Sequence, residues 1–394
     1  MNIFIIPSWY PSKSNPIYGI FNQEQALILA SQRPHFNVGV SKWGQGDERF
    51  LLPAYSPSSI FKIFKKHDPQ VSHLRSNLTE YFTPAFTWTR KVLKGNIDGI
   101  YNSNKRNLEQ FINQYGKADI ICAQATYPAA LIAKRLAQEL DVPYTVTIFM
   151  SPFPFNEFLD KKGQLKSLIS EPLQNANRLL SSCNALMQTM RSFELQNISV
   201  IPLPVDTDYF TPDQSTIPAK ITILSVGRLE EQKGYDILLR AIQKIDEPIE
   251  LRIAGDGSLL NKYKKLAIDL KLDQKVKWLG LLDKSQVREE MRSCSFYVLS
   301  SRHETFGIVQ TEAMACGKPV VATKCGGPED IISESNGILC ENEDVQSLSD
   351  AIKKMITEYK TFSSEKIRKE TVLKYGPEAW VNQIENVFKE IIAM

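Results

Sequence analysis

The chain has 394 residues, of which 43% are hydrophobic and 23% charged, and its formal net charge is +3. This length suffices for two domains with full cores, and the composition excludes fibrous and low-complexity classes. No run of about 18 apolar residues occurs, so no membrane-spanning helix is expected. Residues 1–7 are apolar but lack the length and basic start of a signal peptide, so we expect a buried first strand and a cytoplasmic protein.

Charge is distributed unevenly along the chain. Residues 1–205 hold 21 Lys and Arg against 14 Asp and Glu, whereas the remainder holds 26 against 30. A basic first half indicates an anionic partner, such as a lipid-linked phosphate or peripheral contact with an anionic membrane, or else a chance asymmetry of solvated surface. Nucleic acid is not expected, because the basic residues are dispersed and the isoelectric point is only about 8.3.

The six cysteines form no Cys-x-x-Cys pair, and each lies in or near an apolar stretch, so we expect free buried thiols. The four histidines, His35, His67, His73 and His303, have no spacing typical of metal ligands. No metal site is therefore expected.

Short apolar runs alternate with amphipathic stretches in the first half. Strands are expected at residues 3–6, 120–123 and 144–149, and helices at 23–32 and 129–140. This alternation predicts a parallel, doubly wound sheet.

Residues 59–96 combine seven Lys and Arg with two acids and interleaved aromatic residues. A segment of this composition could lie on an anionic membrane or bind a lipid-linked acceptor. The reading we prefer is a helical hairpin whose aromatic residues face the core. The large apolar members are Ile60, Phe61, Phe64, Tyr81, Phe82, Phe86 and Trp88.

Pro202, Pro204 and Pro212 indicate a linker between residues 200 and 220, after which a second alternation begins. Strands are expected at residues 221–227, 249–255, 276–280, 296–300 and 319–323, and helices at 235–244 and 259–270. We therefore expect two Rossmann-like domains facing a cleft, at residues 1–203 and 204–376, and a closing helix at 377–394 that packs back toward the first domain. Ligands of such sheets bind at the carboxyl ends of the strands.

Two carboxylates lie eight residues apart after the expected strand at 296–300. Glu304 precedes a helix that should begin near Phe306 and end at Gly317, and Glu312 lies inside it. At about 1.5 Å rise per residue the spacing is roughly 12 Å, comparable to the distance from ribose to sugar ring across a diphosphate. Helix N-terminal amides between them suit a phosphate. An ordinary core helix with two incidental acids would leave Glu312 without a purpose.

Two cations follow the strand that is expected to end at Gly227. Arg228 and Lys233 lie on its carboxyl-end loop, where they could neutralise a departing nucleoside diphosphate. Taken alone, such loop cations are usually solvated charges.

Together these segments resemble family-4 GT-B glycosyltransferases, the retaining enzymes that carry a Glu-x7-Glu motif. The resemblance covers the second half closely and the first half loosely. It implies that the domain at residues 1–203 binds the acceptor and that the domain at residues 204–376 binds the nucleotide-sugar donor. It also implies that Glu304 contacts the transferred sugar, that Glu312 contacts the ribose, and that the Gly227-Arg228…Lys233 segment binds the diphosphate. We expect Glu304, Arg228 and Lys233 to be the catalytic residues.

The same resemblance implies further donor-binding residues. Backbone amides of Phe306 and Gly307, flanked by Thr305 and Ile308, would face sugar and phosphate. Three matches are weaker. Gly255 lies in a strand-end turn near the base, and Leu281 lies where residues of the family surround the base. Gly19 lies in a glycine loop that approaches the donor phosphates. The turn from Cys325 to Asp330 is typical of the family and expected to be structural.

Two positions bear on the limits of the resemblance. Phe149 stands roughly where many members carry a His near the donor sugar, and Phe can neither donate a hydrogen bond nor take a proton. Asp206-Thr207-Asp208 mimics the metal-binding Asp-x-Asp of the other glycosyltransferase fold, but it lies in the expected linker.

The sequence thus predicts a retaining, metal-independent transferase that needs no cofactor and uses a nucleotide-diphosphate sugar, UDP first and GDP next. Its acceptor would be a hydroxyl of a glycan or lipid-linked molecule, with bacterial surface polysaccharide synthesis as the expected role. Two alternatives stay open. One is a nucleotide-sugar epimerase of the same architecture, and the other is a nucleotide-sugar binding protein without catalysis.

Overall fold

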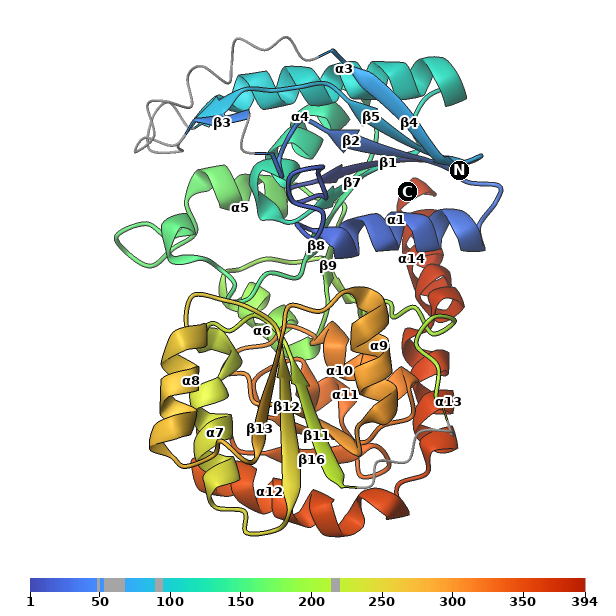
Figure 1. Cartoon of the computed structure of the whole chain (residues 1–394). Helices are drawn as coiled ribbons and strands as arrows, with labels where there is room; N and C mark the ends of the chain where they lie inside the picture. Colours follow the sequence, from blue (N-terminus) through green and yellow to red (C-terminus); the bar gives the residue numbers. More distant parts are fainter. Residues whose placement is uncertain (48–49, 53–67, 89–94, 214–219, 394) are drawn as a thin grey trace. The chain divides into compact units, whose positions relative to one another are not determined.

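The computed structural model of the chain describes residues 1–47, 50–52, 68–88, 95–213 and 220–393. These residues form two compact units. The first consists of Met1–Ser181, Met187–Ile201 and Val381–Met394, and the second of Ser182–Leu186 and Pro202–Trp380. Each unit is built on a sheet with helices packed against it (Figure 1). The prediction of an α/β fold with two Rossmann-like domains is confirmed.

The sheet of the first unit has eight strands. They are β1 Asn2–Pro7, β2 Asn37–Lys42, β4 Gln70–Arg75, β5 Leu78–Phe82, β7 Ile120–Gln124, β8 Tyr144–Ile148, β9 Arg178–Ser181 and β10 Ile198–Val200. The order is β10-β9-β8-β7-β1-β2-β5-β4. Among the described strands of this sheet, only the edge pair of β4 and β5 is antiparallel. The central strands β1 and β7 read as continuous apolar runs because helices cover both faces of a parallel sheet.

The helices of the first unit are α1 Ile20–Gln32, α3 Ile97–Tyr115, α4 Leu131–Leu140 and α5 Ser167–Gln174. Figure 1 shows α3 on one face of the sheet and α1 on the other. A short pair of β3 Leu51–Leu52 and β6 Thr87–Trp88 lies outside the main sheet. The C-terminal helix α14, Pro377–Ile392, contributes its second half to this unit, where Arg33 Nε donates to Glu385 Oε2 over 2.5 Å.

The sheet of the second unit is entirely parallel. Its strands are β11 Ile221–Val226, β12 Ile249–Ala254, β13 Val276–Gly280, β14 Phe296–Leu299, β15 Val320–Thr323 and β16 Gly337–Cys340. They follow the order β13-β12-β11-β14-β15-β16.

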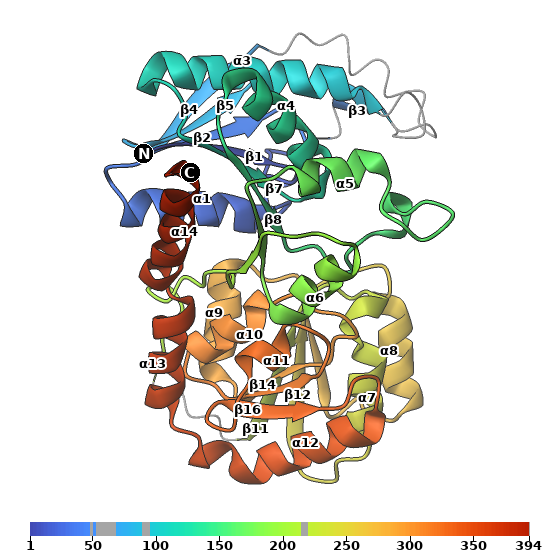
Figure 2. The ribbon, with the colours of Figure 1, turned by 180° about the vertical axis from the view of Figure 1, so that it is seen from behind.

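The helices of the second unit are α7 Tyr235–Gln243, α8 Leu260–Asp269, α9 Lys284–Ser293, α10 Ile308–Ala315, α11 Pro328–Ile331, α12 Val345–Glu358 and α13 Ser364–Tyr375, and α6 Asn184–Ser192 begins in this unit. Figure 2 shows the same elements from behind. The main core joins β11, β12 and β14 to α7, α8 and α12.

Local signals explain where several of these helices begin and end. Asp283 caps α9 by a capping box with Gln286, and the Asp344 carboxylate accepts from the first amides of α12. Gly317, just beyond α10, has φ +76°, the left-handed conformation that glycine adopts at helix ends. The expected end of that helix is confirmed.

The structure corrects the preferred reading of residues 59–96. Ile60, Phe61, Phe64 and His67 lie outside the described residues. The described part is a β-hairpin of β4 and β5 rather than a helical one, because these strands extend the parallel sheet at its edge. Tyr81 is buried, whereas Phe82 and Phe86 pack their rings against Phe50.

The six cysteines are free thiols, as expected, and five of them are buried while Cys325 is half-buried. Within the described ranges, no helix has both the length and the hydropathy that crossing a membrane requires.

Candidate functional site

The carboxyl ends of β11 and β12 meet through two glycines. Gly227 N donates to Ala254 O over 3.0 Å, and a Cβ added to Gly255 would lie only 2.0 Å from Gly227 O. Gly255 also has φ +136°, which side-chain-bearing residues avoid. The backbones approach so closely that glycine alone fits at position 255. Gly227 and Gly255, both expected in the donor site, therefore lie side by side.

Leu281 stands beside this pair. It follows Gly280, the last residue of β13, whose carbonyl accepts from Gly255 N over 2.7 Å. The Leu281 side chain is 66% exposed. The Leu281 side chain is therefore accessible to solvent beside the glycine pair.

Arg228 and Glu230 belong to the loop after β11. Arg228 is exposed. Glu230 accepts from Ser258 N over 2.8 Å and from Ser258 Oγ over 2.6 Å. These hydrogen bonds, followed by the charge of Arg228, lower the pKa of Glu230. The loop is thus tied to the segment after β12, while the Arg228 guanidinium remains accessible to an anion.

Lys233 is held at the end of β14. The next residue, Gly234, has φ +63° and starts α7, and a Cβ there would lie 2.0 Å from Ser300 O. Ser300 Oγ donates to Lys233 O over 2.9 Å. The close approach of these two loops requires glycine at 234 and sets the direction of the Lys233 side chain.

An ion pair joins the two expected motifs. Lys233 Nζ lies 2.5 Å from Glu304 Oε2, across 71 residues of sequence. The two side chains are 21% and 10% exposed, respectively. The pair is therefore partly shielded from water yet open on one side, which strengthens its electrostatic field relative to a solvated pair.

The backbone of Glu304 is fixed by the turn at Cys325–Asp330. Glu304 N donates to Cys325 O over 3.0 Å, and Gly327 N donates to Glu304 O over 2.6 Å. A Cβ on Gly326 would lie 2.6 Å from Glu304 O. The Glu329 carboxylate accepts from the amides of Cys325 and Gly326 and so holds the turn itself. This turn, which was expected to be structural, positions Glu304.

The helix that follows begins later than predicted. α10 starts at Ile308 rather than near Phe306, so Glu304 lies in a loop and the helical rise does not set its distance from Glu312. Gly307 caps the helix with φ +85°, and a Cβ there would lie 3.2 Å from Glu304 Cγ. The 12 Å estimate assumed a helical rise for all eight residues from Glu304 to Glu312. This assumption is wrong, because only the four steps from Ile308 to Glu312 are helical.

Side chains around α10 divide between core and surface. Phe306 is 2% exposed and packs edge-on against Tyr375, with 5.6 Å between ring centroids. Thr305, Ile308 and Glu312 are half-buried. The first turn of a helix leaves amide groups that the helix itself cannot satisfy. Phe306 thus anchors a segment whose backbone amides begin α10 beside Glu304.

Sequence reasoning missed a second ion pair that braces these loops. Arg302 donates two hydrogen bonds to Asp236, over 2.9 Å to Oδ1 and 2.8 Å to Oδ2. Arg302 Nη1 also donates to Glu231 O, and Arg302 N to Gln232 O, both over 2.7 Å. Burial alone would raise the pKa of Asp236, but the Arg302 hydrogen bonds and charge hold it below its usual value. The position of Arg302 in the sequence, two residues before Glu304, is the one signal that could have drawn attention to it.

Two other expected or notable residues lie in the first unit. Gly19 has φ +69° at the start of α1, and a Cβ there would lie 2.4 Å from Trp9 C. Phe149 is 8% exposed and contacts the rings of Trp9 and Phe21, with centroids 6.1 and 4.9 Å away. Phe149 is therefore part of an aromatic cluster after β8, which accounts for an apolar residue at that position.

No group of three His, Cys, Asp or Glu side chains in the described ranges could hold a metal ion. In the Asp206-Thr207-Asp208 run, Asp206 accepts from Tyr209 N over 3.1 Å and lies 3.6 Å from Lys284 Nζ. The Asp206 carboxylate thus closes a turn.

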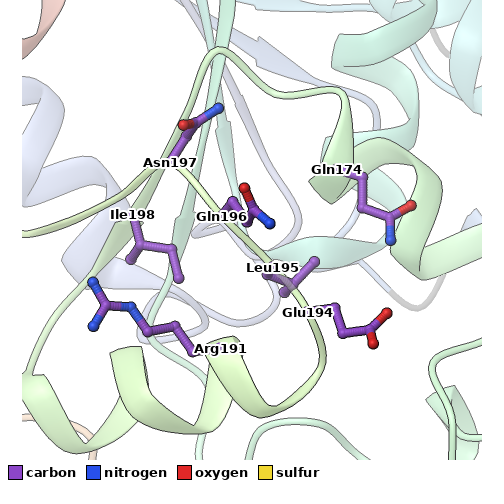
Figure 3. A pocket seen from close by; sticks show the side chains of 7 residues that line it. All are labelled: Gln174, Arg191, Glu194, Leu195, Gln196, Asn197 and Ile198. Atoms are coloured by element: carbon purple, nitrogen blue, oxygen red, sulfur yellow. The ribbon is translucent and has the colours of Figure 1, made fainter.

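A separate pocket of the first unit is shown in Figure 3. It has a volume of about 630 Å³ and is lined by Gln174, Arg191, Glu194, Leu195, Gln196, Asn197 and Ile198. No residue expected from the sequence to bind the donor lines it.

Comparison with known proteins finds a family that part of the second half of the chain resembles. Residues 210–371 match the family of glycosyl transferases group 1. An uncharacterized glycosyltransferase of Methanocaldococcus jannaschii is 35% identical over 176 residues, which are 43% of this chain and 48% of that protein. The phosphatidylinositol N-acetylglucosaminyltransferase gpi3 subunit of Schizosaccharomyces pombe is 33% identical over 302 residues, 73% of this chain and 63% of that protein. The matches span about half to two thirds of these curated relatives.

Solved structures match over almost the whole chain. A sucrose-phosphate synthase from Thermosynechococcus elongatus has a TM-score of 0.76 at 18% identity. The match covers 100% of this chain and 99% of the synthase chain. The HepE protein of Anabaena, solved in complex with UDP, has a TM-score of 0.69 at 17% identity and covers 99% of each chain. Residues 210–371 thus resemble glycosyl transferases group 1, and the chain has the GT-B fold of these solved structures.

Proposed function

We propose that the chain transfers a hexosyl or N-acetylhexosaminyl group from a nucleotide-diphosphate sugar to a hydroxyl of a glycan or lipid-linked acceptor. The observation that carries this proposal is the 2.5 Å ion pair of Lys233 and Glu304. It brings a cation suited to a diphosphate and a carboxylate suited to sugar hydroxyls into contact, at the carboxyl-end edge where parallel sheets bind ligands.

The proposed roles follow from position and charge. Arg228 and Lys233 bind the diphosphate, together with the amides of Phe306, Gly307 and Ile308 at the start of α10. Glu304 orients the transferred sugar with Thr305 beside it, and Glu312 binds the ribose. Gly227, Gly255 and Leu281 border the base. Gly19, in the first unit, is proposed to approach the donor phosphates.

The proposed reaction retains the configuration of the sugar and requires no metal ion or cofactor. A bond forms between the acceptor oxygen and the anomeric carbon, and the bond from that carbon to the nucleoside diphosphate breaks. The acceptor proton passes to an oxygen of the departing diphosphate. Lys233 and Arg228 stabilise the negative charge that grows on this leaving group.

The donor base and the acceptor are proposed from the relatives. HepE was solved with UDP, so uridine is the first candidate and guanosine the second. The Schizosaccharomyces relative is named as an N-acetylglucosaminyltransferase of phosphatidylinositol, which favours a lipid-linked acceptor. We assign the chain to bacterial surface polysaccharide synthesis, in the cytoplasm or at the inner membrane face, where its basic first half would contact anionic lipid.

The first experiment is the thermal shift of the purified protein with UDP, GDP and ADP and their sugar conjugates, with and without EDTA. A ligand that binds only the folded state raises the melting temperature with the logarithm of its excess over Kd. A selective shift that EDTA leaves unchanged supports the proposed donor site. The absence of any shift, or its loss with EDTA, contradicts the site or its independence of metal.

Product analysis with an acceptor separates this proposal from the two alternatives. A transferase yields a glycoside and free nucleotide. An epimerase yields an isomeric donor, and a binding protein yields neither. The buried Phe149, where a histidine was expected, is the one feature that favours a binding protein.

A further inference from the structure

None of the residues assigned to the donor lines a second pocket of the first unit, although Gly19 lies beside its lining residue Tyr10. The pocket has a volume of about 190 Å³ and is bordered by the segments that follow β1 and β2 and by the end of β5. These three strands are parallel neighbours, so their carboxyl ends meet at one edge of the sheet. Ligands of open α/β sheets bind at this edge. The lining residues are Tyr10, Pro11, Ser12, Lys13, Lys42, Gly44, Gln45, Gly46, Asp47, Phe50, Gln70, Ser72, Glu80 and Phe82.

A buried carboxylate organises the floor of this pocket. Glu80 is 5% exposed. Its Oε1 accepts from Tyr10 OH over 2.7 Å and from Gln23 Nε2 over 3.1 Å, and its Oε2 accepts from Lys42 Nζ over 2.9 Å. Burial and the Glu80 charge raise the pKa of Tyr10, so its hydroxyl remains protonated. The network holds polar groups in place before any ligand arrives, which lowers the entropy cost of binding.

The charges of the pocket favour a neutral ligand. Among the residues that the structure describes, its charged lining residues are two lysines, Lys13 and Lys42, and two carboxylates, Asp47 and Glu80. Lys42 is already engaged by Glu80. A phosphate or carboxylate ligand is normally met by an excess of cationic donors. Equal numbers of both signs provide no such excess.

The remaining lining combines aromatic rings with neutral polar groups. Phe50 and Phe82 pack with ring centroids 5.8 Å apart. Gln70 pairs with Phe82, and Ser72 with Glu80, across the antiparallel hairpin, so these side chains share one face of the sheet. Amides and hydroxyls both donate and accept hydrogen bonds. A pyranose ring has the matching chemistry, with apolar C–H faces and a rim of hydroxyls.

We propose that this pocket binds a neutral sugar residue of the acceptor, which makes the acceptor a glycan. The inference rests on the proposed function and deepens it, because it names the chemical class of acceptor and the residues that recognise it. It concerns recognition within the first unit alone.

The test measures sugar binding directly, by saturation-transfer difference NMR of the full chain. The probes are the methyl glycosides of glucose, galactose, mannose and N-acetylglucosamine, with glycerol 1-phosphate as an anionic probe. Ser72→Trp fills the pocket from an exposed position of β4, where a large side chain does not disturb the core. Gln174→Trp places the same side chain at an exposed position of the pocket in Figure 3 and is the matched control.

At least one glycoside is expected to give a signal with the wild type and with Gln174→Trp, and a signal at least tenfold weaker with Ser72→Trp. Gln70→Ala removes one amide from the same face and should weaken the signal severalfold, so the test survives if Ser72→Trp fails to fold. The absence of glycoside signals, equal signals in Ser72→Trp and Gln70→Ala, or binding of glycerol 1-phosphate alone would overturn the proposal.

The thermal shift with UDP is recorded on the same samples and reports the donor site separately. Ser72→Trp should keep this shift, because the proposed base and diphosphate contacts lie mainly in the second unit. A wild type that shifts with UDP but binds no glycoside contradicts only the sugar pocket. A wild type that binds glycosides but neither binds nor turns over a nucleotide sugar contradicts the proposed function, and with it the acceptor role of the sugar.

Discussion

Lys233 and Glu304 form an ion pair with 2.5 Å between Nζ and Oε2, although 71 residues separate them in the chain. Each belongs to a loop that a glycine holds against its neighbour, Gly234 against Ser300 and Gly326 against Glu304. The protein thus pairs the two charges that we assign to the diphosphate and to the sugar. A donor that binds both must replace this contact with its own.

Replacing Glu304 with Ala or Gln should lower the rate of sugar transfer by about 10²–10³-fold, as expected when a preorganised polar contact to the reacting sugar is lost. The melting temperature should change little, because a single partly exposed ion pair adds only about 1 kcal/mol to stability. Transfer rates and thermal unfolding of the purified variants measure both effects. Glu231→Gln, at an exposed position of the neighbouring loop, is the control. Near-normal turnover in Glu304→Ala would refute the assigned role.

Replacing Gly255 with Ala should destabilise the second unit, because the new Cβ would lie 2.0 Å from Gly227 O. The matched control is Gly280→Ala, whose φ is +71° but whose Cβ would meet nothing within 4 Å. The control should lose roughly 1–2 kcal/mol from the left-handed backbone alone. Gly255→Ala should lose about 1–3 kcal/mol more from overpacking. Urea unfolding measures the free energy of unfolding of both variants. Equal losses in Gly255→Ala and Gly280→Ala would show that the loops at Gly227 and Gly255 move apart easily.

Replacing Asp236 with Asn should reduce stability by about 1 kcal/mol at pH 7, since the bidentate contact with Arg302 loses its charge. The pKa of Asp236 is lowered in the folded protein, so its stabilising effect is present above the unfolded pKa and disappears as the pH falls through the folded pKa. The free energies of unfolding of variant and wild type should therefore converge in acid. Asp269→Asn, at an exposed position of α8, is the control. A difference that persists at the lowest pH would mean that packing rather than charge is lost.

Cys325 should resist alkylation although it is the one cysteine that is not fully buried. Burial, with a smaller contribution from the charges of Glu304 and Glu329, raises the pKa of Cys325 to about 12. The thiol therefore stays protonated at pH 8, and only the thiolate reacts. Mass spectrometry after brief treatment with iodoacetamide should find Cys325 unmodified in the native protein and modified in urea. Rapid modification of the native protein would show that the turn beside Glu304 opens.

Much of the second unit could be read from periodicity. The strand expected at 276–280 has those bounds. The one expected at 221–227 ends a single residue early, and it is mostly a buried apolar run, as is typical of a central parallel strand. The hairpin of β4 and β5 was misread because its pairing, rather than its composition, decides its structure. The same holds for Glu304, whose distance from Glu312 was estimated from a helix that begins only at Ile308.

The sequence by itself determined the two successive β-α alternations and the end of α10 at Gly317. These are properties of neighbouring residues, and local backbone preference is enough to express them. Only the tertiary structure decided that Lys233 meets Glu304, that the turn at Gly326 holds Glu304, that Arg302 braces the loops through Asp236, and that Glu80 is buried under a pocket. Such contacts join residues far apart in the chain, and they exist because close packing of loops at the sheet edge leaves room for one arrangement.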